Sequence, residues 1–116
     1  MTAERGDRPI ESVRWNRKTA IVNVAGEIDL NTSSAFQQGL LGVLDESPRR
    51  IVVNLSGVSY MDSSGVASLV KLLSRVRRNG TSLRLCGLNE RVRGVFEITR
   101  LDSVFEIYDG ENEALA

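Results

Sequence analysis

Residues 49–78 read RRIVVNLSGVSYMDSSGVASLVKLLSRVRR, and this stretch decides the fold. Its first part, residues 49–57, has an apolar centre, which is typical of a strand buried on both faces of a sheet. From about residue 64 to 78 the apolar residues recur at helical spacing, which predicts an amphipathic helix. We expect its buried stripe to comprise Val66, Leu69, Val70, Leu73 and Val76. The polar run YMDSSG, residues 60–65, separates this strand from this helix.

The preceding residues predict a hairpin and a first helix. Residues 13–26, VRWNRKTAIVNVAG, form two strands around a tight turn at 16–18, because TAIVNVAG alternates in polarity. GEID follows at 26–29. The helix after it begins at Asn31 or Thr32, either of which is a suitable N-cap. Its inward residues are Ala35, Phe36, Leu40, Val43 and Leu44.

The residues after the deciding stretch continue the alternation of strand and helix. Asn79-Gly80 suits the left-handed end of a helix. Residues 82–88 predict a strand, Asn89 caps a short helix, residues 103–109 predict a last strand, and a short terminal helix follows. The predicted order is β-β-α-β-α-β-α-β-α, which implies an α/β domain with a mainly parallel or mixed sheet.

Composition excludes several functions. The chain has 116 residues with 15 basic and 15 acidic side chains, so its charge balance suggests neither a nucleic acid nor a membrane surface as partner. No apolar run approaches the roughly 18 residues of a membrane span, and no targeting segment is evident, so we expect a cytoplasmic protein. Cys86 is alone and reads as a buried strand residue. Histidine is absent, which excludes histidine-based nucleophilic catalysis and histidine metal sites.

The serines of YMDSSG leave several interpretations open. Either one can cap the helix. A hydrolase nucleophile at Ser63 lacks one flanking glycine and a histidine, and Lys71 lies about 12 Å along the helix. No glycine-rich phosphate loop is present, although weak nucleotide contact at residues 63–65 stays open. Asp29 and Asp62 both follow strands, as in phosphoreceiver domains, but the late lysine of such domains is missing.

A serine that accepts a phosphate explains the run better. An exposed hydroxyl at a helix N-terminus suits a phosphate because the free N–H groups stabilise its charge. Gly65 fits this interpretation if its missing side chain lets a kinase or partner approach the backbone. By these physical criteria, either Ser63 or Ser64 can be the acceptor.

Three segments together resemble the STAS-domain anti-sigma factor antagonists of bacteria. They are GEIDLNTSSAF, IVVNLSGVSYMDSSGVASLVKLL and LRLCGLNERVRGVFEITRLDSVFEIY, and the resemblance covers roughly residues 10–115. The resemblance implies a single STAS-type domain at 9–116, after a flexible tail at 1–8. It implies a mixed sheet of about five strands with about four helices, mostly on one face. We expect Trp15 and Leu30 to lie in its core.

The resemblance also implies a function. Such proteins are switches without enzymatic activity or cofactor, and bind an anti-sigma factor that is itself a GHKL-type serine kinase. The kinase phosphorylates the serine after the aspartate, here Ser63, which releases the complex, and a PP2C-type phosphatase reverses the step. The remaining residues of the partner-binding loop are then Asp29, Thr32, Asp62, Ser64 and Gly65. Alternatives are a STAS subunit of a lipid-transport ABC system or stress-signalling assembly, and a weak nucleotide-binding regulator.

Overall fold

The computed structural model describes residues 9–116, so the expected flexible tail at residues 1–8 lies outside the described residues. The predicted order of strands and helices is confirmed, with one short 3-10 helix added. The elements are β1 (Ile10–Asn16), β2 (Thr19–Ile28), α1 (Ser33–Leu44), β3 (Arg50–Met61), α2 (Ser63–Asn79), β4 (Ser82–Cys86), α3 (Glu90–Ile98), the 3-10 helix η2 (Leu101–Ser103), β5 (Glu106–Tyr108) and α4 (Glu111–Leu115).

The five strands form one mixed sheet in the order β1-β2-β3-β4-β5. The two-residue turn between β1 and β2 makes that pair antiparallel, whereas each later pair is joined through helical segments and is parallel. All four parallel strands therefore begin at one edge of the sheet and end at the opposite edge. These two edges are called the amino edge and the carboxyl edge below.

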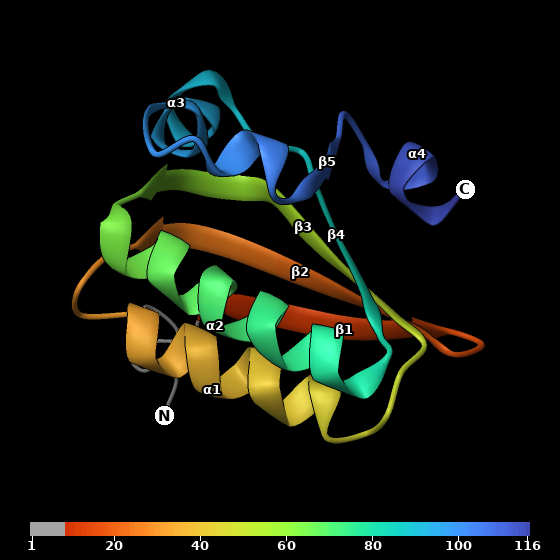
Figure 1. Ribbon diagram of the computed structural model, residues 1–116. Helices are drawn as coiled ribbons and strands as arrows, with labels where there is room; N and C mark the ends of the chain where they lie inside the picture. Colours follow the sequence, from red (N-terminus) through yellow and green to blue (C-terminus); the bar gives the residue numbers. More distant parts are fainter. Residues whose placement is uncertain (1–8) are drawn as a thin grey trace.

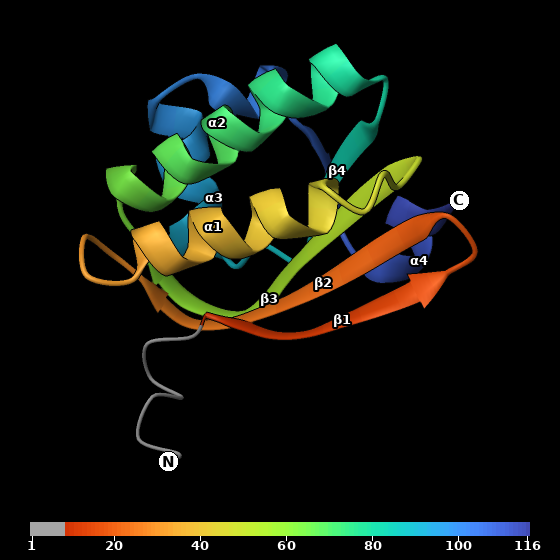
Figure 2. The same ribbon diagram turned by 90° about the horizontal axis from the view of Figure 1, so that it is seen from below.

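Three of the four helices cover one face of the sheet, as expected. Residues of α1, α2 and α3 share the main core with the sheet, and α1 and α2 lie side by side across it (Figures 1 and 2). Asn89 caps α3 by accepting a hydrogen bond from Val92, and Gly80 ends α2 in the left-handed conformation, both as predicted. None of the helices within residues 9–116 is long and apolar enough to cross a lipid bilayer.

The short helix α4 covers the other face of the sheet. It contributes to a small second core made of Ile21, Val52, Cys86 and Ala114. Cys86 is buried there, as expected. Burial raises the pKa of the Cys86 thiol to about 11, and the nearby charges of Glu111 and Glu113 add to this effect. The thiol therefore stays protonated at neutral pH.

Strand β3 is longer than predicted. The sequence interpretation ended it at residue 57, but it continues to Met61, because β2 also extends to Ile28 and pairs with it residue for residue at the end. Irregular register between Asn23 and Glu27 accommodates the glycines of both strands. Pairing with β2 therefore continues the strand past Ser56 and Gly57, two residue types that are common in turns. A single residue, Asp62, then separates β3 from α2.

Three predictions about burial in these elements are wrong. Val70 is 40% exposed, because the stripe of α2 that faces the sheet passes through Leu72. Trp15 is 42% exposed. It lies on β1, which is the edge strand and has a neighbouring strand on one side only. Ala35, expected inward on α1, is also exposed.

Candidate functional site

The polar run after β3 lies at the carboxyl edge, beside the end of β2. Ile28 is the register partner of Met61, so the next residues, Asp29 and Asp62, leave neighbouring parallel strands together. The backbone N–H of Asp62 donates a hydrogen bond of 3.1 Å to the carbonyl of Ile28, which ties the two chain segments. In open α/β sheets this edge is where functional residues gather.

Asp62 is the N-cap of α2. Its backbone is extended, and its carboxylate accepts hydrogen bonds from the Ser64 backbone N–H at 2.9 Å and from the Ser64 hydroxyl at 2.5 Å. The prediction that a serine caps this helix is therefore wrong, because the helix begins one residue earlier than expected. The cap engages Ser64 through both its backbone and its side chain.

The two serines are consequently not equivalent. Ser64 is half-buried and its hydroxyl is bonded to Asp62. Ser63 is the first residue of α2 and is exposed. Among the hydrogen bonds formed within residues 9–116, none involves the Ser63 hydroxyl. Of the two serines, Ser63 is therefore the one that presents an unengaged hydroxyl to solvent.

The fold lowers the pKa of Asp62 below its ordinary value. The hydrogen bond from the Ser64 hydroxyl is the main cause. Burial opposes it, and the backbone N–H groups of Ser64, Gly65 and Leu30 each lower the pKa further by a smaller amount. Asp62 is therefore a carboxylate at neutral pH. A negative charge lies directly beside the exposed Ser63.

Asp29 and Thr32 organise the turn that leads into α1. The Asp29 carboxylate accepts hydrogen bonds from the N–H of Asn31 at 2.9 Å and of Thr32 at 3.2 Å. The Thr32 hydroxyl accepts from the Asp29 N–H and lies 2.9 Å from the Glu27 carbonyl, to which it donates. Thr32 begins α1 as expected, but its side chain is turned back toward the end of β2. These bonds fix the position of the second carboxylate at this edge.

Gly65 is buried, and its missing side chain is required inside the protein. A Cβ atom at this position would lie 2.7 Å from Ile28 Cγ2 and 2.7 Å from Met61 Cγ. Such distances are shorter than carbon atoms tolerate. The expectation that Gly65 clears space for a partner is thus wrong in its physical reason. Gly65 allows the first turn of α2 to approach the ends of β2 and β3.

Leu30 is not in the core, contrary to expectation. It is 79% exposed, because the hydrogen-bonded turn at residues 29–32 directs it outward before α1 begins. Tyr60, the third residue before Ser63, is 38% exposed and pairs in register with Glu27 at the same edge. Both residues expose apolar surface at the same edge of the sheet as Ser63. Tyr60 was missed because its segment was assigned to a loop.

Ser68 is a second residue that the sequence interpretation missed. It is buried on α2, and its hydroxyl lies 3.1 Å from the Ser33 carbonyl in α1 and 3.2 Å from the Ser64 carbonyl. It connects the first turns of the two helices that border the site. A small polar residue among the apolar positions of the buried helix face is the signal that would have found it.

Comparisons with known proteins agree with this description. A family model for the STAS domain matches residues 12–114. An anti-sigma-B factor antagonist from Staphylococcus aureus (strain NCTC 8325 / PS 47) is 35% identical over 89 residues, which are 77% of this chain and 82% of the relative. The crystal structure of an anti-sigma factor antagonist from Mycobacterium paratuberculosis has a TM-score of 0.83 and 28% identity, covering 90% of this chain and 88% of its own.

A more distant structure shares the fold alone. The anti-sigma factor antagonist SpoIIAA in its unphosphorylated form has a TM-score of 0.76 and 22% identity, covering 90% of this chain and 91% of its own. The matched family region runs from the first strand into the last helix and includes the whole carboxyl edge. The chain therefore belongs to the STAS domain family, with the anti-sigma factor antagonists as its relatives.

Proposed function

We propose that this protein is an anti-sigma factor antagonist that binds its partner while Ser63 is unmodified and releases it once Ser63 carries a phosphate. The observation that supports this proposal best is the difference between the two serines. Ser64 donates its hydroxyl to the cap residue Asp62, whereas the Ser63 hydroxyl is exposed and unengaged. Ser63 is the acceptor, and Ser64 completes the cap that positions it.

The position of Ser63 suits a phosphate without loss of the fold. At the first position of α2, a phosphate lies beside backbone N–H groups that lack partners within the helix and near the positive end of the helix dipole. Modification of an exposed side chain at such a position changes the stability of the fold little. The added charge of about −1.5 to −2 then acts mainly on a bound partner.

Two features of the surroundings explain why the charge of a phosphate on Ser63 would weaken binding of the partner. Asp62 and Asp29 already place negative charge at this edge, so a phosphate adds to an acidic surface. The exposed Leu30 and Tyr60 give a partner apolar contact area at the same edge of the sheet as the acceptor. A partner that packs on these side chains desolvates the phosphate and the carboxylates together, which weakens the complex.

The partner that fits is an anti-sigma factor with a GHKL-type serine kinase fold, and a PP2C-type phosphatase regenerates the binding form. The antagonist SpoIIAA, which shares this fold, was solved in an unphosphorylated form, which implies that SpoIIAA also has a phosphorylated form. The antagonist itself contributes a protein surface and a substrate hydroxyl.

Phosphorylation in vitro tests the proposal. The protein is incubated with ATP and a GHKL-type serine kinase from the same organism, and the modified residue is located by mass spectrometry. We expect phosphate on Ser63 in the wild type and in Ser64→Ala, and none in Ser63→Ala. Phosphate on Ser64, or binding of the kinase that is insensitive to phosphate, would contradict the switch.

A further inference from the structure

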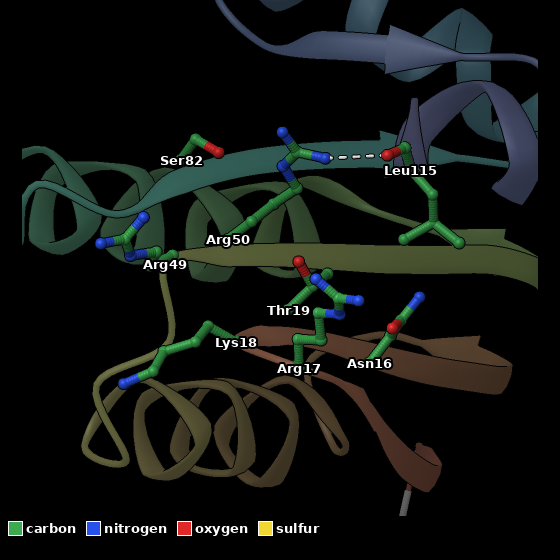
Figure 3. Close-up of a pocket in the computed structure, with 8 residues that line it drawn as sticks. All are labelled: Asn16, Arg17, Lys18, Thr19, Arg49, Arg50, Ser82 and Leu115. Carbon is green, nitrogen blue, oxygen red and sulfur yellow. Dashed lines mark hydrogen bonds between the residues drawn. The ribbon is translucent and has the colours of Figure 1, made fainter.

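A second polar site lies at the amino edge of the sheet, far from Ser63. Figure 3 shows a pocket of about 550 Å³, within the range of small-molecule sites. Its lining residues come from four separate parts of the chain: Asn16, Arg17, Lys18, Thr19, Arg49, Arg50, Ser82 and Leu115. Strand β3 connects the two sites, with Arg50 at one end and Met61 at the other, roughly 35 Å apart by the rise of a strand.

The register of the sheet builds this pocket. Thr19, Arg50 and Ser82 are direct partners at the beginnings of β2, β3 and β4, so they form one row across the three strands. The backbone N–H of Arg49 donates to the Lys18 carbonyl at 2.8 Å, and the Arg49 carbonyl accepts from the Ser82 N–H at 3.0 Å. The pocket therefore has a rigid backbone frame.

The lining is strongly basic. Four of the eight residues are cations and none is acidic: Arg17, Lys18, Arg49 and Arg50. Within residues 9–116 the ion pairs involve three other arginines, and these four cations take part in none of them. Four positive charges around one hollow repel one another unless an anion lies between them. Asp45 and Glu46, which follow α1, are exposed and lie outside the lining.

Two of the cations have distinctive local structure: Arg50 makes a specific hydrogen bond, and Arg17 has an unfavourable backbone conformation. Arg50 donates from Nη1 to the Leu115 carbonyl at 3.0 Å, so its guanidinium is fixed at the wall formed by α4 (Figure 3). Arg17 has φ of 59°, in the left-handed region, where asparagine or glycine is more stable in a two-residue hairpin turn. A cation occupies a position that the backbone alone would give to another residue.

We propose that this pocket binds a compact anion that carries two or more phosphate groups. Guanidinium groups form paired, charge-assisted hydrogen bonds with phosphate oxygens, and several of them match a ligand with several such groups. The hydroxyls of Thr19 and Ser82 and the amide of Asn16 supply further neutral donors around the same space. This site is separate from Ser63 and does not depend on the role proposed for that residue.

Titration with tripolyphosphate tests the site. Calorimetry measures the affinity, and backbone amide NMR spectra locate the contact. We expect shifts at Lys18, Arg50 and Ser82, and also at Leu115 because Arg50 connects the pocket to α4. The amides of Ser63 and Ser64 stay unchanged. Absence of binding at millimolar tripolyphosphate, or shifts spread over every basic residue, would overturn the proposal.

A pair of matched double variants separates a pocket from general attraction. Arg17→Ala with Arg49→Ala removes two exposed lining cations and is expected to weaken binding about tenfold or more. Arg77→Ala with Arg78→Ala removes the same charge from the exposed last turn of α2, outside the lining, and is expected to leave the affinity nearly unchanged. An equal loss in both double variants would show nonspecific electrostatic binding and refute the site. Thermal unfolding of each variant checks that the fold is intact.

The phosphate groups can belong to a soluble molecule or to a lipid headgroup, and a second arm distinguishes these sources. Flotation with phosphatidylcholine vesicles that contain phosphatidylinositol bisphosphate measures headgroup binding. Flotation that is lost in the Arg17/Arg49 variant assigns the site to a headgroup. No flotation, together with retained tripolyphosphate binding, assigns it to a soluble ligand.

Discussion

The carboxyl and amino edges of the sheet differ in how their polar groups are satisfied. At the carboxyl edge, Asp29 bonds Thr32 and Asp62 bonds Ser64, and both carboxylates also accept from backbone N–H groups, while the Ser63 hydroxyl stays exposed. At the amino edge, four cations line a hollow without a carboxylate in the lining. A site whose groups are already paired can present one atom with little ambiguity. The four lining cations take part in no ion pair within residues 9–116, and our proposal that an anion binds there rests on this difference.

The comparison also shows what an even charge balance conceals. The chain has 15 basic and 15 acidic residues, a balance that suggests neither a nucleic acid nor a membrane surface as partner. In the fold, Asp29 and Asp62 follow neighbouring strand ends at the carboxyl edge, whereas four cations line one pocket at the amino edge. Net charge describes the whole surface, whereas binding depends on the local field.

The largest expected effect tests the close packing of the carboxyl edge. Gly65→Ala places a Cβ 2.7 Å from both Ile28 and Met61, so we expect a loss of about 1–3 kcal/mol in the free energy of unfolding. Gly42→Ala, in α1 with no atom within 4 Å of the new Cβ, is the control and is expected to be neutral or stabilising by up to about 1 kcal/mol. Chemical denaturation measures both. Equal stabilities would show that the first turn of α2 can move away at no cost.

The cap of α2 gives the next effect. Asp62→Ala leaves the N-terminal N–H groups of α2 and the Ser64 hydroxyl without their acceptor, and about 1 kcal/mol of stability is expected to be lost. Asp62→Ser restores a capping oxygen and should recover most of it. If the serine variant is as unstable as the alanine variant, the contribution of Asp62 lies elsewhere than in capping.

A charge mimic tests the release mechanism at the carboxyl edge. Ser63→Asp is expected to weaken binding of the kinase partner several-fold, about 1 kcal/mol, because the new charge lies beside Asp62 and the partner surface. Ser74→Asp, also exposed on α2 but near its other end, serves as the matched control. Surface plasmon resonance compares the two. The electrostatic mechanism fails if both variants bind like the wild type.

Glu111, on the face of the sheet that α4 covers, belongs to neither edge and serves as a reference for the effect of a paired carboxylate on stability. Glu111 accepts from Arg14 at 2.7 Å and from Asn54 at 3.0 Å, and the Arg14 bond is the main cause of its lowered pKa. A lowered pKa stabilises the fold above the unfolded value of about 4.5, and this contribution disappears as the pH falls through the folded pKa.

Glu111→Gln is therefore expected to cost less than about 1 kcal/mol at pH 7, since the pair is partly exposed, and nothing well below pH 4. Urea denaturation across this pH range measures the difference between variant and wild type. A difference that is independent of pH would mean that the charge of Glu111 does not contribute.

The smallest effect examines the backbone at the amino edge. Arg17→Asn relieves the left-handed arginine and is expected to stabilise the fold by about 0.5–1 kcal/mol while weakening tripolyphosphate binding. Lys18→Asn removes the same charge at the neighbouring turn position, where φ is not positive, and should give no gain in stability. Were both substitutions to change stability equally, relief of charge repulsion rather than of backbone strain would be the cause.

The fold was predictable from the sequence because its signals are local. Alternation marks the hairpin, helical periodicity marks α1 and α2, and Asn89 and Gly80 mark helix ends. The end of β3 was not predictable in this way. The turn-like pair Ser56-Gly57 suggests that the strand stops there, but pairing with β2 carries it on to Met61.

The sequence predicts which residues lie at the candidate site, but not which hydrogen bonds and packing contacts they make. The six proposed residues do lie around one edge, yet the difference between Ser63 and Ser64 depends on which oxygen Asp62 accepts from. The role of Gly65 depends on Ile28, far earlier in the chain. The amino-edge pocket had no sequence signal, because its lining is assembled from four distant segments.

The one-residue connection between β3 and α2 has a consequence for any enzyme that acts on Ser63. The backbone there is held in one conformation, because Asp62 is hydrogen-bonded to Ile28 and to Ser64. Ser63 is therefore displayed as part of a folded surface rather than as an extended peptide. Such an enzyme must recognise the shape of this domain, and a short peptide copied from residues 58–70 lacks the feature that would make it a substrate.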